Sequence, residues 1–546
     1  MQGSSSGPIS LNVLTSKNTG ELGPPCRAER VAVAIDFHGG ATDPLEPELG
    51  NASGGREMDT NIAYGLMIAT LGIFGYIGYQ ASNANEIDAD EYLSARGSQD
   101  WRRIGLSLFA SGMGVWVLLT PSEVAYYGGF WDVMGYAASA ATPFILLAYV
   151  GPIIRERLPE GITLADYAKH KLGRPMQIYV GIISILYMFT FLFAEFTAIG
   201  KAMEYLAGME PVVPMIFVGV ITAAYTAYGG LPASLATDRF QAWAISFLVI
   251  VLLLVLFGFD LGQVIDDARA YNTDDDWSML GSMNYMGSFQ SGLALVVAIT
   301  AAEMFSQGNW QRVYASQDDE ALRKGALLAS CMVFPLVFVM GVMGTVAAGQ
   351  GGVEDVSLAF FHLVDKSSTL IAAAFVLLVI SLVCSSTDTL QNAIAASVSR
   401  DLSDSKFDLR ISRVITLLML PLAIYLATGP VILGLNFGDS YSVFGIFLFA
   451  DILAAATVIP ILLTLWNGVS SKGALLGCLA GIISVFLYGL IEPPTDSEFY
   501  MYLFHPTISG LPAADGGLTN LWVFVSALVG SGLVTVLGSY ALPNEQ

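Results

Sequence analysis

Five consecutive polar residues, Ser385 to Thr389, lie within a long apolar stretch of the chain. The adjacent hydroxyls of Ser385 and Ser386 are hard oxygen donors of the kind that small cations prefer. Asp388, about one helical turn further along, would add negative potential. An aspartate at the centre of a bilayer costs about 2.5–3.5 kcal/mol on insertion scales, which makes it a candidate for a functional role. The pattern predicts a cation site, and the alternative is a kink at a packing contact between helices.

A second candidate lies earlier in the chain, where Ser111-Gly112-Met113-Gly114 places two glycines inside an apolar stretch. A disrupted helical turn leaves carbonyl groups without N–H partners, which would free the carbonyls beside these glycines. We expect both stretches to be interrupted in mid-membrane, where carrier sites often lie, although the glycines alone are equally compatible with a packing contact. Sodium accepts about six oxygen ligands, and neutral ones suffice in a preformed cage. The predicted ligands are the carbonyls of Ala110, Met113 and Leu382 and the hydroxyls of Ser385 and Ser386.

Membrane-spanning helices must position these residues. The chain is 54% hydrophobic and 13% charged, and its mean hydropathy of +0.61 is too high for a soluble protein of 546 residues. The apolar runs lack the alternating polar face of a membrane β-barrel, so the fold class is an all-α polytopic membrane protein. Thirteen spans are predicted, at about 60–81, 104–124, 133–154, 177–205, 211–229, 239–258, 289–309, 324–349, 369–400, 411–428, 440–466, 473–491 and 521–540.

Residues 1–57 precede the first span and are rich in Gly, Ser and Pro, with few apolar residues. We expect them to be disordered, and whether they are translated stays open. Residues 58–546 form the predicted membrane domain. With the N-terminus outside and the C-terminus in the cytoplasm, the outer connections between spans hold only Arg269 and Lys366, while the remaining Lys and Arg of the connections face the cytoplasm. This asymmetry predicts an N-out, C-in topology.

The formal net charge of the chain is −22, from 46 acidic and 24 basic residues. The acidic residues crowd the predicted connections, for example at Glu86 to Glu91 and Asp274 to Asp276. High salt screens the repulsion within such a surface. A halophilic host, such as a halophilic archaeon, is therefore our expectation.

Four motifs appear in a fixed order along the chain. The stretch Leu106 to Met113 reads L-S-L-F-A-S-G-M, and Tyr225 to Gln241 contains Y-T-A-Y-G-G followed by T-D-R-F-Q. Gln307 to Arg312 reads Q-G-N-W-Q-R, and Ser385 to Asp388 is followed by Ser399-Arg400-Asp401-Leu402. Together these motifs resemble those of the sodium:solute symporter family, which includes sodium-coupled sugar, proline and urea carriers.

The resemblance implies a leucine-transporter-like fold. Its core would hold ten helices in two inverted five-helix repeats, over residues 104–466. The span 60–81 would precede this core, and two further spans within 473–540 would follow it. The same five sodium ligands are implied. Asp238 matches a family aspartate that influences sodium handling, and the alternative is a helix cap formed with Thr237. Asp388 is the second predicted sodium-coupling residue.

The resemblance also implies a solute pocket beside the break in the second span, against the fourth, seventh and eleventh spans. Trp116 matches a tryptophan of the proline carriers, whereas Gly112 and Gly114 stand where those carriers have aspartate and serine. This difference argues against proline itself. Ionisable residues at membrane depth, which include Glu123, Glu195 and Lys201, are further functional candidates. The predicted pocket residues are Gly112, Gly114, Trp116, Glu303 and Gln307.

The expected function is sodium-coupled uptake of a small polar organic solute by alternating access at the plasma membrane. Urea or an amide, an amino acid and a carboxylate are the candidate solutes. An uncoupled or proton-coupled facilitator or channel is the alternative. No His-Glu-x-x-His or nucleophile-elbow pattern supports an enzyme, so we expect no enzyme activity. Sodium is the expected ligand ion, the bilayer and the solute are the expected partners, no nucleic acid is expected, and one chain is the expected functional unit.

Overall fold

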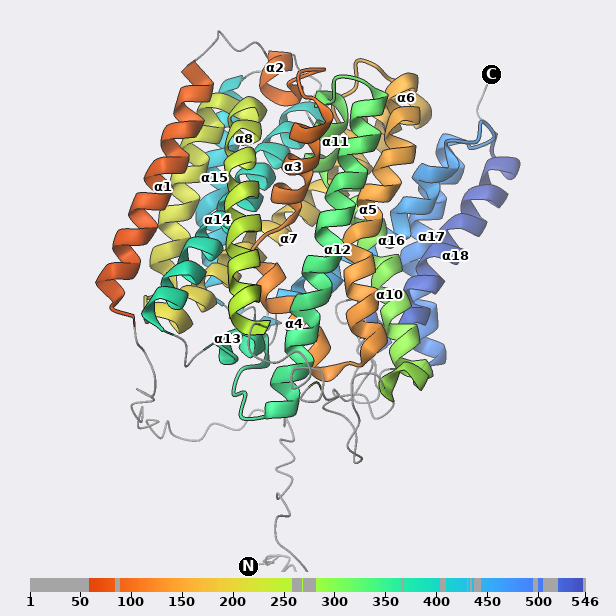
Figure 1. Ribbon diagram of the computed structural model, residues 1–546. Helices are drawn as coiled ribbons and strands as arrows, with labels where there is room; N and C mark the ends of the chain where they lie inside the picture. Colours follow the sequence, from red (N-terminus) through yellow and green to blue (C-terminus); the bar gives the residue numbers. More distant parts are fainter. Residues whose placement is uncertain are drawn as a thin grey trace, which may run out of the picture. The chain divides into compact units, whose positions relative to one another are not determined.

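The computed structural model describes most of the membrane domain as helix (Figure 1). The described residues are 58–83, 89–257, 268, 281–364, 368–402, 409–429, 431–432, 435–436, 443–493, 499–503 and 519–543. Clustering of contacts separates Met1–Ser53 from Gly54–Gln546, and all described residues lie in the second unit. The predicted disordered tail, 1–57, lies outside the described residues.

The helices follow the predicted spans closely. In chain order they are α1 (Thr60–Asn83), α2 (Ala89–Ser94), α3 (Trp101–Gly112), α4 (Trp116–Tyr127), α5 (Phe130–Arg157), α6 (Leu164–Leu172), α7 (Arg174–Ala207), α8 (Val212–Phe257), α10 (Met286–Glu303), α11 (Gln307–Ala315), α12 (Asp319–Gln350), α13 (Ala359–His362), α14 (Thr369–Ser397), α15 (Leu409–Ala427), α16 (Val443–Leu463), α17 (Ser471–Ile491) and α18 (Leu521–Ala541). Short 3-10 turns occupy Gly281–Asn284, Val356–Leu358 and Phe499–Leu503. Strands β1 (Val431–Ile432) and β2 (Leu435–Asn436) pair antiparallel, with Val431 opposite Asn436.

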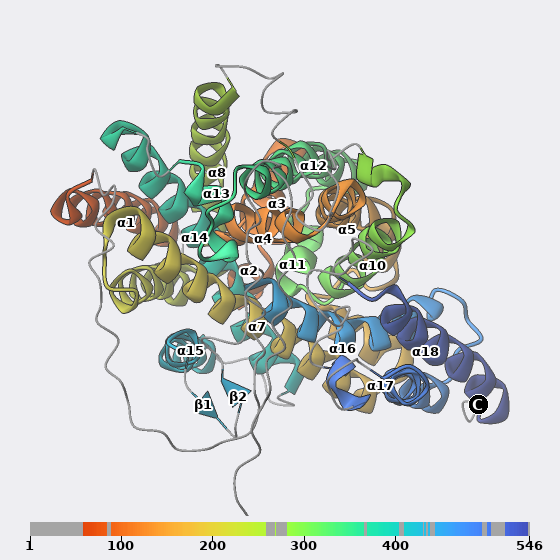
Figure 2. The ribbon, with the colours of Figure 1, turned by 90° about the horizontal axis from the view of Figure 1, so that it is seen from below.

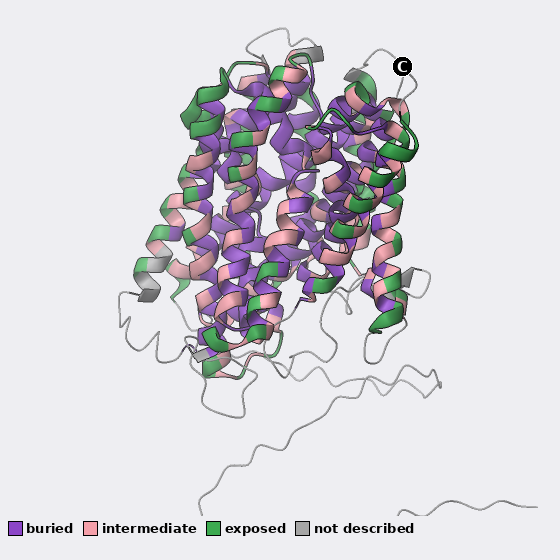
Figure 3. Cartoon of the chain, turned by 90° about the vertical axis from the view of Figure 1, so that its right-hand side faces the viewer, coloured by how far each residue is buried: buried purple, intermediate pink, exposed green. Residues whose placement is uncertain are grey.

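The outer surface of the described helices is apolar, as a surface in contact with lipid must be. Leu254, Leu418 and Leu537 are each more than 60% exposed, on α8, α15 and α18. Figure 3 shows buried residues along the interior of the bundle and exposed ones on its outer helices. Ten described helices are long and apolar enough to span a membrane, and the bent pair α3 and α4 passes the same test together. The protein is therefore a multi-pass membrane protein with an all-α fold.

Helix α8 consists of two helices joined at a kink. Its 46 residues would extend about 69 Å as one helix, roughly twice the thickness of a bilayer core. Gly230 has φ 58° and ψ −147°, and a Cβ at this position would lie 2.4 Å from the carbonyl oxygen of Tyr92. The two halves of α8 correspond to the predicted fifth and sixth spans. Counting them separately and including the shorter α15 would give thirteen spans, a total that stays a prediction.

Tyr92 of α2 stabilises this kink. Its hydroxyl donates hydrogen bonds to the carbonyls of Thr226 (3.0 Å) and Ala227 (3.2 Å), in the turn before Gly230. Burial, opposed in part by the positive charge of Arg413, raises the pKa of Tyr92 to about 12, so the hydroxyl keeps the proton that it donates. The positive φ of Gly230 and the hydrogen bonds of Tyr92 thus explain why one span ends at the Y-T-A-Y-G-G motif.

Among the described spans two are discontinuous, and one of these breaks lies where the sequence predicted it. The axes of α3 and α4 differ by 59° across Met113–Val115, which confirms the predicted break in the second span. The predicted break in the ninth span is wrong, because α14 is helical through Ser385–Thr389 and becomes π-helical only at Val398–Leu402. The second break separates α10 from α11, at Met304–Ser306 in the predicted seventh span.

The broken pairs lie near the centre of the bundle. Seen from below, α3 and α4 lie between α14 and α5, and α11 lies close by (Figure 2). Helix α14 packs against α7 and α8, and α12 packs against α3, α4 and α5. On the periphery, α1 packs against α8 and α14, whereas α17 and α18 form a hairpin against α16 (Figures 1 and 2). Polar groups freed at the breaks are thereby shielded from lipid.

Candidate functional site

A buried carboxylate occupies the break between α3 and α4. The backbone N–H of Val115 donates to Glu195 Oε2 of α7 (2.9 Å) instead of continuing the helical ladder. A Cβ on Gly114 would lie 1.9 Å from Glu195 Oε1, so glycine is required for this close approach. Before the break, the N–H of Met113 is shared between the carbonyls of Phe109 (3.1 Å) and Ala110 (3.2 Å). The chain leaves helical geometry at Met113, with ψ near 98°.

Ser386 of α14 meets the same carboxylate. Its hydroxyl lies 2.9 Å from Glu195 Oε2 and also within reach of the carbonyls of Leu382 (3.3 Å) and Val383 (3.2 Å). Glu195 therefore joins the break to the polar part of α14. The carboxylate of Glu195, the hydroxyl of Ser386 and the carbonyl of Leu382 are oxygen groups of the kind that a small hard cation prefers.

Ser385 points to a different carboxylate. Its hydroxyl donates to Asp238 Oδ1 of α8 (2.9 Å), while Asp238 Oδ2 accepts from Ser107 of α3 (2.5 Å) and from Arg312 of α11 (2.7 Å). The alternative interpretation of Asp238 as a helix cap is wrong, because Asp238 lies inside α8. The two adjacent serines thus bind two separate carboxylates, and the ion cage predicted around both hydroxyls stays a prediction.

Arg312 is the centre of a buried polar network. Its side chain is fully buried and donates through Nε to Ser107 (2.7 Å) and through its two terminal nitrogens to Gly308 O (3.0 Å), Asp238 and Thr389 (2.9 Å). A buried ion pair is stable only when its remaining donors and acceptors are satisfied, and this one meets that condition. The arginine links α11 to α3, α8 and α14. Sequence reasoning noted Arg312 within a motif but did not assign it a role.

Asp388 lies next to the Arg312 network, and its carboxylate accepts three hydrogen bonds from α8. Tyr225 (2.6 Å), Ser234 (2.9 Å) and Thr237 (3.1 Å), all of α8, donate to its carboxylate. Ser234 also lies 3.3 Å from the hydroxyl of Thr389, which binds Arg312. The two predicted coupling aspartates therefore share one hydrogen-bonded network between α8 and α14.

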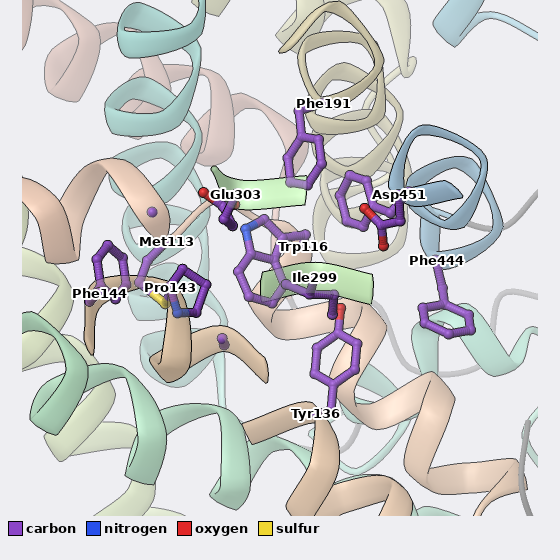
Figure 4. Close-up of a pocket in the computed structure, with 13 residues that line it drawn as sticks. Met113, Trp116, Tyr136, Pro143, Phe144, Phe191, Ile299, Glu303, Phe444 and Asp451 are labelled. Atoms are coloured by element: carbon purple, nitrogen blue, oxygen red, sulfur yellow. The ribbon is translucent and has the colours of Figure 1, made fainter. Parts of the chain in front are cut away.

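A cavity lies beside the broken helix (Figure 4). The empty space within its walls and at its open mouth amounts to about 550 Å³. The lining residues come from the break, α5, α7, α10 and α16, and are Gly112, Met113, Trp116, Tyr136, Ala140, Pro143, Phe144, Phe191, Ile299, Glu303, Phe444, Phe447 and Asp451. Of the predicted pocket residues, Gly112, Trp116 and Glu303 line this cavity. Gly114 packs against Glu195, and Gln307 donates to the carbonyl of Ile162 (2.7 Å).

Two carboxylates and no Lys, Arg or His are among the lining residues of this cavity. Glu303 accepts hydrogen bonds from Tyr187 and Asn309, both at 2.8 Å. Asp451 is 2% exposed, and within the described part of the chain its Oδ2 has no hydrogen-bond partner. Sequence reasoning missed Asp451, although a lone carboxylate inside the apolar run 443–463 was a usable signal.

Aromatic rings surround these carboxylates. Trp116 meets Tyr136 and Phe447 edge to face, with ring centroids 6.1 and 6.5 Å apart. Phe191 stacks on Phe447 at 4.1 Å. The negative faces of aromatic rings attract organic cations, and they do so more strongly when water is excluded. The cavity therefore offers negative charge and aromatic surface together.

Comparison with protein families agrees with this geometry. A model of the sodium:solute symporter family matches residues 92–481, more than two thirds of the chain. The chain belongs to the sodium:solute symporter family. It is accordingly a transporter rather than an enzyme, and its family supports sodium-coupled uptake of a solute.

Individual relatives place this symporter among carriers of different solutes. The spermidine transporter DUR31 of Candida albicans is 28% identical over 454 residues, which cover 81% of each chain. Sodium/proline symporter 2 of Staphylococcus saprophyticus is 23% identical over 475 residues, which cover 81% of this chain and 88% of that one. A solved Na+-coupled sialic acid symporter, in a substrate-bound outward-open state, matches with a TM-score of 0.69 and 13% identity over 89% of this chain and 98% of its own. That likeness confirms the leucine-transporter-like fold.

Proposed function

We propose that this symporter takes up a small organic cation of the polyamine class together with sodium ions. The observation that carries the proposal is the cavity beside the broken helix, where Asp451 and Glu303 lie among aromatic rings without a lining cation. A buried carboxylate without a counter-charge is costly, and a bound ammonium group would supply that counter-charge. The similarity to a spermidine transporter supports the same class of solute.

The same cavity argues against the other candidate solutes. A carboxylate solute would be repelled by Asp451 and Glu303. An amino acid carries a carboxylate of its own, which in this fold type often binds at the N-terminus of a half helix. Here the N–H of Val115 at that terminus is already bound to Glu195. Urea has no charge to offset the two carboxylates of the cavity.

The proposed sodium site lies where α14 faces the break. The carbonyls of Ala110, Met113 and Leu382 and the hydroxyls of Ser385 and Ser386 are its proposed ligands. The hydroxyl of Ser385 also connects the site to Asp238. A bound sodium ion would hold the broken helix against α14 and so stabilise one state of the alternating-access cycle. Each sodium ion that enters the cell would supply free energy for solute uptake. The contribution is about 2.3 kcal/mol per 100 mV of membrane potential and about 1.4 kcal/mol per tenfold ratio of outside to inside sodium concentration.

Further elements of the proposal concern the setting of the protein. We propose a plasma-membrane location, with the N-terminus outside and the C-terminus in the cytoplasm, in line with the distribution of Lys and Arg. We propose that one chain is the functional unit, since the residues proposed for the solute cavity and for the ion site all belong to one chain.

The proposal is tested with purified protein in liposomes. An inward sodium gradient should drive accumulation of labelled spermidine above its external concentration, while an equal potassium gradient should not. Labelled proline, urea and sialic acid serve as comparison solutes. Accumulation of one of these instead of spermidine would refute the solute class, and mere equilibration of spermidine would favour the uncoupled facilitator.

A further inference from the structure

Glu195 lies midway along α7 with its side chain 1% exposed. Its Oε2 accepts hydrogen bonds from the N–H of Val115, the residue before α4, and from the hydroxyl of Ser386 on α14, both at 2.9 Å. The backbone of Trp116 adds a further hydrogen bond. One carboxylate therefore touches both segments that are proposed to hold sodium.

The other oxygen of this carboxylate is the unusual one. Glu195 Oε1 is buried and has no hydrogen-bond partner within the described part of the chain. It lies directly against Gly114, where the absence of a side chain leaves room for it. In the described part of the chain, the groups that donate hydrogen bonds to Glu195 are backbone N–H groups and a hydroxyl, all of them neutral.

The buried Asp238 makes an informative contrast. Asp238 also lies at membrane depth and also binds a serine of α14, but Arg312 pairs with it at 2.7 Å. A buried negative charge is stable when a positive charge lies beside it, and costly when none does. Asp238 has its counter-charge in the protein, whereas the described contacts of Glu195 provide none.

We infer that Glu195 is itself a ligand of the coupling sodium ion, through Oε1. The inference rests on the proposed function, and it changes the chemistry of that site. A cage of carbonyls and hydroxyls alone is neutral, whereas this cage is anionic until sodium enters. Sodium binding then neutralises Glu195 and ties α7 to the α3–α4 break and to α14 at once. Neither the motifs nor the break predicted that α7 takes part in the ion site.

The competing explanation is that Glu195 only caps the N-terminus of α4. A cap needs an acceptor oxygen but not a full negative charge, since the helix N–H groups bind neutral oxygens as well. Glu195→Gln separates the two roles, because the amide keeps an acceptor of the same reach and loses the charge.

The experiment measures binding of 22Na+ and sodium-dependent thermal stabilisation of the purified full chain, without solute. Glu195→Gln should raise the sodium concentration for half-saturation by about tenfold or more, as expected when a charge in contact with the ion is removed. Glu123→Gln is the matched control, since it removes a buried glutamate of α4 that is outside the lining of both sites. The control should keep the half-saturation of the wild type.

Each outcome has a distinct meaning. If Glu195→Gln binds sodium as tightly as the wild type, the carboxylate is only a cap and the inference is wrong, while the proposed function stands. If the wild type itself neither binds 22Na+ nor is stabilised by sodium, the proposed function fails as well. Should Glu195→Gln not reach the membrane, Glu195→Asp decides, because it keeps the charge and must still be stabilised by sodium. An Asp variant that folds but ignores sodium contradicts the inference.

Discussion

At the scale of single residues, the two adjacent serines of α14 have different partners. Ser386 binds Glu195 at the break, and Ser385 binds Asp238 in the arginine network. The sequence supports the choice of these serines as polar groups at membrane depth. It does not separate their partners, because the carboxylates lie on α7 and α8, almost two hundred and one hundred and fifty positions away along the chain.

Ser386→Ala should abolish sodium stimulation of uptake while the protein stays in the membrane. The change removes a proposed ion ligand and a donor to Glu195 Oε2. Sodium-dependent uptake in liposomes is the measurement. Ser381→Ala is the control, since the hydroxyl of Ser381 bonds only to the carbonyl of Leu377 within α14 among the contacts described. Normal sodium dependence in Ser386→Ala would rule out the proposed ion site.

Asp451→Asn should weaken binding of spermidine by about 2 kcal/mol, roughly thirtyfold in Kd, because a buried ion pair with the solute is lost. Binding is measured by calorimetry at saturating sodium. Asp451→Glu keeps the charge and should retain most of the affinity. If the asparagine variant binds spermidine normally, the cavity is not a cation site.

At the scale of elements, the α3–α4 break and the α10–α11 break differ in whether glycine or proline marks them in the sequence. The break in the second span is marked by Gly112 and Gly114. The break after α10 contains no glycine and no proline at Met304–Ser306. It is stabilised by side chains further along, since Trp310 donates to the carbonyl of Met304 (2.7 Å) and Asn309 donates to the carboxylate of Glu303 (2.8 Å). Two residues of the Q-G-N-W-Q-R motif thus form hydrogen bonds with polar groups at the break. The spacing of the motif in the sequence does not reveal these bonds.

The predicted break in α14 is wrong for a related reason. Ser385, Ser386, Asp388 and Thr389 bond to carbonyls of their own helix or to polar groups of neighbouring helices. These four residues are satisfied without an opening of the backbone, whereas Thr387 Oγ1 is buried without a hydrogen-bond partner among the described residues. A run of polar residues inside a span therefore indicates polar partners on the neighbouring helices. Whether the helix stays regular depends on whether those partners satisfy the polar side chains.

Asp238→Asn should destabilise the protein by about 3–5 kcal/mol, because Arg312 would remain buried without its counter-charge. Thermal unfolding of the purified protein measures the change. The double variant Asp238→Asn with Arg312→Met removes both charges and should recover part of the loss. If the double variant is less stable than the single variant, the ion pair is not what joins α11 to α3, α8 and α14.

At the scale of the whole molecule, the all-α membrane fold follows from the sequence because every span must satisfy its own backbone in lipid. The count of thirteen spans, the topology and the fate of residues 1–57 remain predictions. The net charge of −22 is also a property of the whole chain.

The charge predicts a dependence on salt. Lowering the salt concentration from molar to about 0.01 M extends the screening length from about 3 Å to about 30 Å and increases repulsion within the acidic surface. We expect a lower melting temperature in dilute potassium chloride, with sodium omitted to avoid its specific effect. An unchanged melting temperature across this range would refute the idea of a halophilic host.

The central claim is that sodium and an organic cation bind to one broken helix and favour each other. Calorimetric titration of the purified protein with spermidine, in sodium and in an equal concentration of potassium, tests it most directly. We predict tighter spermidine binding in sodium, and by reciprocity an equal increase of sodium affinity in saturating spermidine. Equal spermidine affinity in the two salts would contradict the account.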